Sequence, residues 1–198
     1  MLSMDEIKVI VQTAHKRGKR VSAHVSRSSH LAMAIRGEVD DVAHMVIDSL
    51  PDSLVTRMIE KNIYWVPTLE LWKGVSHMFG LDWDVRAKDN LRRFVQAGGE
   101  VALGTDYAGY VTPFELGMPL PEMQLMLEAG MTAMQTIIAG TRHAADVCGL
   151  ESELGTIEAG KIADIVVVKD NPLESIQSLL AVQMVIHNGE VVWNEGDY

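Results

Sequence analysis

The chain has 198 residues, 47% of them hydrophobic and 22% charged, which is typical of a soluble globular protein with a sizeable core. Its formal net charge of −10 argues against nucleic-acid binding, because a polyphosphate backbone requires a basic surface. The single cysteine, Cys148, excludes an internal disulfide bond and a cluster of thiolate ligands. No apolar run approaches the ~20 residues of a membrane span, and the start MLSMDEIKVIVQ is typical of an amphipathic helix, not of a signal peptide. We therefore expect no membrane association and a cytoplasmic location.

Helix-period and strand-like segments alternate through the first half of the chain. Ser3 and Glu6 form a capping pattern at the start of an expected helix that ends near Gly18. Four short apolar runs are each expected to form a buried strand, and they lie at 19–25, 39–46, 63–69 and 100–104. A helix is expected before each run, the last of them at 83–97. Alternating units of this kind predict an α/β fold with parallel strands and helices packed outside them.

The remaining segments are less regular. Residues 70–82 contain Gly74 and Gly80 and are expected to form a loose connection, and 107–121 is long enough to be a functional lid. Helices are expected at 122–129 and 132–148. Turn signals then separate short β-branched runs at 162–168, 182–187 and 190–193. We therefore expect two domains, residues 1–150 and a small β element at 151–198.

Three polar residues each lie at the C-terminal end of an apolar run: His24, His44 and Asp106. His24 and His44 are one helix–strand unit apart, so adjacent parallel strands would place them side by side at one edge. Two imidazoles and a carboxylate are ligands that zinc accepts, and manganese or iron are also compatible. A divalent ion lowers the pKa of bound water, and Asp106 could then accept a proton as general base. The pattern thus predicts a metal-dependent hydrolytic site.

The same residues also allow a structural interpretation. A histidine after an apolar run is often a buried core residue, and an aspartate at a strand end often caps the next helix. Three further residues are candidates for substrate binding, namely Arg27 just past His24, His77 on the expected loop, and Tyr107 in the expected lid. An ordinary surface arginine is the alternative for Arg27.

Beyond spacing, the motifs resemble a known family. VSAHV, DDVAHM, YWVPTLE and VALGTD are similar to strands five to eight of the metal-dependent amidohydrolase superfamily. LGTIEAGKIADIVVVKDNPL, followed by VIHNGEVV, resembles the C-terminal strands of that superfamily's composite β-sandwich. The resemblance covers nearly the whole chain and is strongest to the imidazolonepropionase-like and dipeptidase branch.

The resemblance implies the C-terminal half of a (β/α)₈ TIM-like barrel plus part of the β-sandwich. It implies that His24 and His44 are metal ligands, and that Asp106 binds metal and activates water. One or two divalent ions, chiefly zinc, and a small-molecule substrate with an amide or cyclic amide C–N bond are expected. The family's HxH motif and its strand-four ligand have no counterpart in this sequence. The activity of this chain alone is therefore in doubt.

Two other functions remain open. The chain could be a catalytically silent fragment or a subunit that completes a barrel with a separate N-terminal half. It could also be a non-catalytic binder of small molecules, for which metal would be irrelevant. Because an open half-barrel exposes strand edges and apolar surface, we expect either self-association or a complementary N-terminal half.

Overall fold

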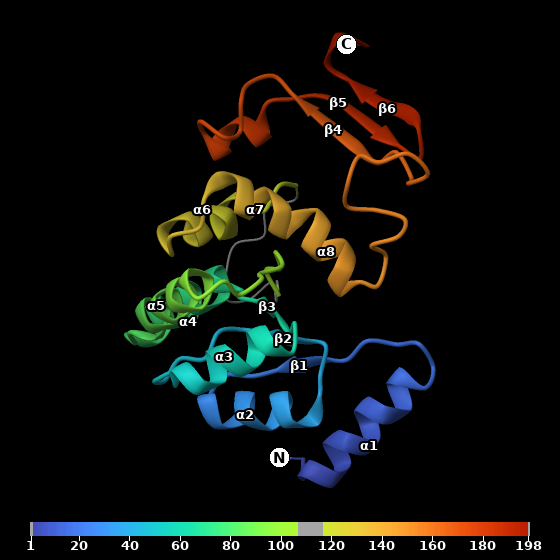
Figure 1. The fold of residues 1–198 in the computed structure, drawn as a ribbon. Coiled ribbons are helices and arrows are strands. Elements are labelled where there is room, and N and C mark those ends of the chain that lie inside the picture. The colour runs from blue at the N-terminus through green and yellow to red at the C-terminus, as the bar shows by residue number, and fades with distance from the viewer. Residues whose placement is uncertain (1, 107–116, 198) are drawn as a thin grey trace.

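The computed structural model describes residues 2–106 and 117–197. Three parallel strands form the first sheet, in the order β1 (Ser22–His24), β2 (Asp41–Ala43) and β3 (Tyr64–Val66) (Figure 1). Val101 forms a parallel bridge with Trp65, so the fourth apolar run continues this sheet beyond β3. The mixed α/β fold predicted from the sequence is therefore confirmed.

Helices precede and follow each strand and are stacked along the length of the molecule (Figure 1). They are α1 (Met4–His15), α2 (Ser28–Gly37), α3 (Asp52–Glu60), α4 (Leu69–Phe79), α5 (Trp83–Gln96), α6 (Leu120–Glu128), α7 (Ala133–Gly140) and α8 (Arg142–Val147). The predicted capping box at Ser3 and Glu6 is present at the start of α1. The predicted helix at 83–97 corresponds to α5.

The prediction of a loose connection at 70–82 is wrong, because most of this segment forms helix α4. Leu69, Trp72 and Ser76 are buried along one face of α4, with the spacing of an amphipathic helix. Gly74 is tolerated inside the helix, and Gly80 ends it with a left-handed backbone (φ 63°), which glycine adopts without steric cost. The buried face therefore outweighed the low helix propensity of glycine.

The expected single helix at 132–148 is also wrong, since it is divided into α7 and α8 at Thr141. Thr141 has φ −123° and ψ −88°, which interrupts the helical backbone. Gly140 lies beside this break, and a Cβ added there would be 2.9 Å from Leu103 Cδ2. The break therefore coincides with the close approach of α7 to the fourth apolar run.

The strands are shorter than predicted because the backbone turns sharply at their C-terminal ends. β2 ends before His44, which has a left-handed backbone (φ 70°), and β3 ends before Pro67 and Thr68 (φ 49°). Trp65 is fully buried and packs edge-on against Phe94 of α5, with ring centroids 5.0 Å apart. This face of the sheet is thus covered by helices, while His24, offset by one residue from Ala23, points to the opposite face.

A second sheet follows α8. It is antiparallel, in the order β4 (Ile165–Val168), β5 (Val182–His187) and β6 (Glu190–Asn194), with η1 (Ile176–Leu180) and η2 (Glu195–Asp197) beside it. The β5–β6 hairpin turns at Asn188 and Gly189, both at positive φ, which is typical of an Asn-Gly turn. The two termini lie at opposite ends of the molecule (Figure 1).

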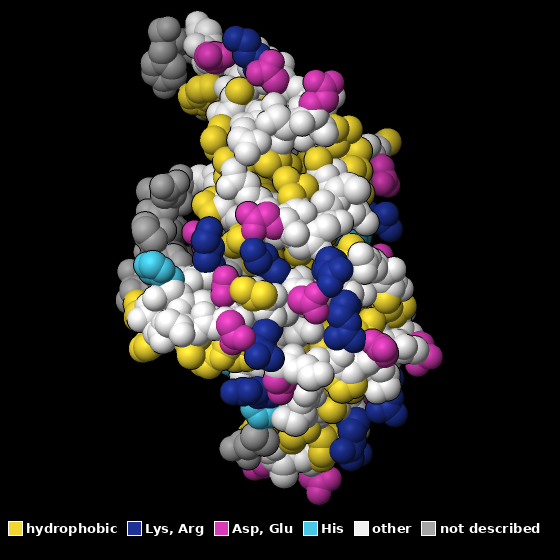
Figure 2. Space-filling model, turned by 90° about the vertical axis from the view of Figure 1, so that its left-hand side faces the viewer, with side chains coloured by type: hydrophobic (Ala, Val, Ile, Leu, Met, Phe, Trp, Pro, Cys, Tyr) yellow, Lys and Arg dark blue, Asp and Glu magenta, His cyan; other side chains and the backbone are white. Residues whose placement is uncertain are grey.

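The surface of the helical layer is charged with both signs. On the face seen in Figure 2, Lys and Arg side chains alternate with Asp and Glu side chains over the middle of the molecule, and hydrophobic side chains are visible above them. Within the described ranges, no helix combines the length and apolar character that crossing a bilayer requires.

Candidate active site

The three residues singled out by the sequence meet at the C-terminal edge of the parallel sheet. The imidazole rings of His24 and His44 lie edge to face, with centroids 4.4 Å apart. Nε2 of His44 is 3.4 Å from a carboxylate oxygen of Asp106. His24 ends β1 and His44 follows β2, so the parallel register brings them together although they are distant in sequence.

The main chain around His44 is tightly held. Its N–H donates to the Val66 carbonyl oxygen at 2.9 Å, and its own carbonyl oxygen accepts the Trp65 indole N–H at 2.6 Å. Left-handed backbone angles occur at His44, at Thr68 and at Asp106 (φ 46°). Such positions cost about 1–3 kcal/mol each and tend to cluster at functional sites. Three of the six left-handed non-glycine residues among the described residues thus lie at this edge of the sheet.

The imidazole of His44 is oriented by Thr68. Nδ1 of His44 lies 2.8 Å from the Thr68 hydroxyl oxygen, and both residues are buried. This contact leaves Nε2 on the side of Asp106. A metal-binding histidine is commonly fixed in this way, with one ring nitrogen hydrogen-bonded to the protein and the other presented to the ion.

The environment of His44 favours its neutral form. Burial is the main cause that lowers the pKa of His44, the nearby His24 lowers it further, and Asp106 opposes both. A neutral imidazole is the form that ligates a metal.

The three groups do not form a closed metal site by themselves. The side chain of Asp106 is 60% exposed, and His24 is exposed as well. In residues 2–106 and 117–197, no group of three or more His, Cys, Asp or Glu side chains is arranged to hold a metal ion. The donor types suit a divalent metal, and the arrangement is open on the side of His24.

The other predicted residues are placed differently. Arg27 is exposed at the start of α2, three positions after His24. His77 is not on a loop but exposed in the last turn of α4, roughly 12 Å along that helix from its start at Leu69. Tyr107 lies outside the described residues. The structure thus keeps Arg27 near the rim and places His77 farther away than expected.

Two residues of this region were missed by the sequence reasoning, Thr68 and Glu122. Glu122 of α6 is fully buried, and its carboxyl oxygens accept the N–H groups of Leu69 and Glu70 at the start of α4. Its sequence signal is weak but real, because Glu122 shares a helical face with the buried residues Leu125 and Met126 at i+3 and i+4.

The ionisation of Glu122 is strongly perturbed. Burial raises the pKa of Glu122 to about 8, the two backbone N–H donors act in the opposite direction, and the neighbouring Glu70 adds to the rise. Burial thus favours the protonated carboxyl, while the two hydrogen bonds from backbone N–H groups favour the carboxylate.

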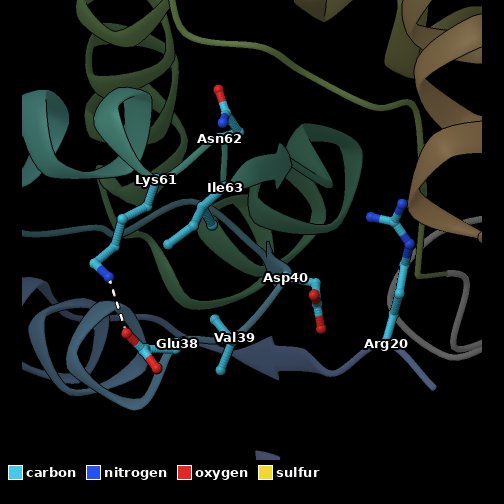
Figure 3. Close-up of a pocket in the computed structure, with 7 residues that line it drawn as sticks. All are labelled: Arg20, Glu38, Val39, Asp40, Lys61, Asn62 and Ile63. Atoms are coloured by element: carbon cyan, nitrogen blue, oxygen red, sulfur yellow. Dashed lines mark hydrogen bonds and ion pairs between the residues drawn. The ribbon is translucent and has the colours of Figure 1, made fainter. Parts of the chain in front are cut away.

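Two pockets lie beside the sheet, and neither is lined by His24, His44 and Asp106 together. A polar cavity of about 180 Å³ is lined by residues that precede the strands, including Arg20, Asp40 and Lys61 (Figure 3). It lies at the opposite edge of the sheet, and its cations are paired, Lys61 with Glu38 and Arg20 with Asp146. An apolar groove of about 400 Å³ is lined by residues of α1, β1 and α2 and includes His24 in its lining.

A parallel sheet with histidines and an aspartate at its carboxyl edge is typical of α/β hydrolytic enzymes that use metals. The model of the amidohydrolase family matches residues 1–192, and the chain belongs to that family.

Individual relatives extend this result. The chain is 30% identical to ochratoxinase of Aspergillus niger over 98% of its own length and 41% of the relative's. It is 28% identical to imidazolonepropionase of Thermoanaerobacter pseudethanolicus, over 98% of this chain and 44% of that protein. The crystal structure of a Xaa-Pro dipeptidase with bound methionine superposes with a TM-score of 0.87 at 28% identity, over 98% of this chain and 49% of that one. The chain thus spans less than half the length of these relatives, which include proteins of the predicted branch.

The perturbed carboxyl of Glu122 generates a pH prediction. Between pH ~4.5 and ~8 the folded protein retains a proton that the unfolded chain has lost, so the stability linked to Glu122 is full below pH ~4.5 and lost as the pH rises to ~8. Urea unfolding of the wild type and Glu122→Gln at several pH values should show the wild-type advantage shrinking over this range.

The exposed Glu128 on the same helix provides the control. Its ion pair with Lys88 lowers the pKa of Glu128, so the difference between wild type and Glu128→Gln should stay constant between pH 5 and 9. A pH-independent difference for Glu122→Gln would contradict the raised pKa.

Proposed function

We propose that this chain carries the metal-binding and general-base residues of a hydrolase that cleaves an amide-type C–N bond in a small molecule. The observation that carries the proposal is the convergence of His24, His44 and Asp106 at the carboxyl edge of the sheet. The substrate class is a short peptide or a cyclic amide, in keeping with the dipeptidase and imidazolonepropionase relatives.

The donor set fits a divalent ion, chiefly zinc, with manganese or iron as alternatives. His44 would offer Nε2, since its Nδ1 faces Thr68, and His24 and Asp106 would complete this side of the site. A bound ion at such a donor set supplies Lewis-acid polarisation of a carbonyl and an acidic water. One ion or two is compatible with these residues.

Asp106 is proposed as the general base. Its exposed carboxylate can accept a proton from the attacking water and return that proton to the leaving nitrogen, so that the C–N bond breaks as the C–O bond forms. Arg27, Tyr107 and His77 are proposed as substrate contacts, with His77 the weakest of the three because of its position late in α4.

Within the family frame, we assign β1, β2, β3 and the run at Val101 to strands five to eight of a (β/α)₈ TIM-like barrel. Residues 1–150 would form the barrel part, and residues 151–198 the C-terminal part of a β-sandwich. The alternative is that the chain alone is catalytically silent. It is favoured by the exposure of His24 and Asp106 and by the open arrangement of the donors.

Replacing the base tests the mechanism. In zinc-supplemented assays of dipeptide and cyclic amide hydrolysis, Asp106→Asn should lower kcat by about 100-fold or more, because the amide cannot accept the proton. The assays use this chain alone and the chain paired with the additional half that longer relatives carry. Asp82→Asn, at an exposed residue that pairs with Arg86, is the matched control and should retain activity. Equal rates for Asp106→Asn and wild type would remove Asp106 from the mechanism.

We further propose that a complementary N-terminal half covers the groove beside β1. Among the described strands, β1 lies at the edge of its sheet with its outer side unpaired. The groove there is lined by apolar residues of α1, such as Ile7 and Ile10, and by Val21 just before β1. The second sheet also exposes apolar side chains, among them Val166, Val191 and Val192. Exposed edges and apolar patches of this kind favour association.

Sedimentation velocity tests this arrangement. The chain alone should show concentration-dependent self-association, because the groove and the strand edge remain uncovered. Addition of the complementary half should replace this behaviour with a defined one-to-one complex. A compact monomer at every concentration, unaffected by the second half, would refute the proposal.

A further inference from the structure

Glu122 holds the start of α4 from a different helix. Its two carboxyl oxygens accept hydrogen bonds from the N–H groups of Leu69, at 2.8 Å, and Glu70, at 2.6 Å. These are the first two residues of α4, and N–H groups at the start of a helix have no acceptor within that helix. A buried carboxyl of α6 therefore serves as the N-terminal cap of α4.

Thr68 occupies the cap position of α4 but does not cap it. Threonine usually accepts a hydrogen bond from the first turn of its own helix, with an extended backbone. Thr68 instead has φ 49° and ψ 48°, and its side chain forms no bond to α4. Its hydroxyl lies 2.8 Å from Nδ1 of His44. Since Glu122 caps the helix, the hydroxyl of Thr68 is available to the histidine.

The state of the His44 ring follows from this arrangement. When Nδ1 carries the proton and donates it to the Thr68 hydroxyl oxygen, Nε2 retains its lone pair on the side of Asp106, 3.4 Å away. The opposite tautomer would place a proton on Nε2 and block it as a ligand. The Thr68 hydroxyl can accept from a protonated Nδ1 or donate to a bare one, so the contact fixes the orientation of the ring, and metal binding at Nε2 uses the form with the proton on Nδ1.

We propose that Glu122 is a positioning residue for His44 and acts through Thr68. By fixing the first turn of α4, it keeps Thr68 in the left-handed conformation that directs its hydroxyl to Nδ1. The effect of these contacts on metal binding rests on the proposed function. The contacts from Glu122 through Thr68 to His44 can themselves be tested without any metal.

The first test is the tautomer of His44, measured by nitrogen-15 NMR of the metal-free chain at neutral pH. The wild type should show one dominant tautomer, and Thr68→Val, which removes the hydroxyl without changing the shape, should give a mixture of tautomers. Glu122→Gln should shift the populations in the same direction, whereas Glu128→Gln on the same helix should not. If Glu122→Gln does not fold, Glu122→Asp keeps the carboxyl but shortens its reach, and it should shift the tautomer likewise. A folded Glu122 variant with the wild-type tautomer, alongside a shifted Thr68→Val, would overturn the proposal.

The second test separates positioning from general stabilisation through a double-mutant cycle in zinc affinity. Glu122→Gln should weaken zinc binding about 10- to 100-fold, as changes to residues behind a metal ligand do. In the Thr68→Val background the same substitution should add little further loss. Independent, additive losses would show that Glu122 only stabilises the fold and would refute the positioning role. A wild type that takes up no zinc would refute the proposed function, and the tautomer measurement would still decide the role of Glu122.

Discussion

The parallel register of β1, β2 and β3 is the constraint on which the candidate site depends. Ala23, Val42 and Trp65 are paired in register across the three strands, so the strands end level with one another. Since parallel strands place all their carboxyl ends at one edge, His24, His44 and Asp106 arrive at the same place although they lie 20 to 82 positions apart in sequence. Helices on the Trp65 side fix the sheet, and the other face remains available for His24.

The turns that follow these strands are as important as the strands. His44, Thr68 and Asp106 all have left-handed backbones, which turn the chain abruptly out of the sheet. This geometry lets the side chain of His44 lie against both His24 and Thr68. The energetic cost is met by buried contacts, notably the Trp65 indole at the His44 carbonyl group. Strained connections held by a rigid core are a common basis for preorganised sites.

Much of this arrangement could be predicted from the sequence, and the remainder could not for physical reasons. The apolar runs before His24 and His44 are short and bounded by polar residues, so the strands and the meeting of their ends follow from alternation with helices. The prediction that His77 lies on a loop was wrong. Glycines at 74 and 80 suggested a loop, but the burial of Trp72 favours a helix through this segment. Glu122 contacts residues 52 and 53 positions away in the sequence, and Thr68 contacts His44 24 positions away. No local sequence pattern encodes contacts over such separations.

The central proposal is that His24, His44 and Asp106 together bind divalent metal, and its simplest form is one ion held by all three. Anomalous X-ray scattering at the zinc edge, from crystals of the zinc-supplemented protein, locates the ion directly. The account predicts a peak about 2.0–2.2 Å from a ring nitrogen of each histidine and from a carboxylate oxygen of Asp106. A zinc peak only elsewhere in the protein, or no peak between these three side chains in a crystal soaked in excess zinc, would contradict the proposal.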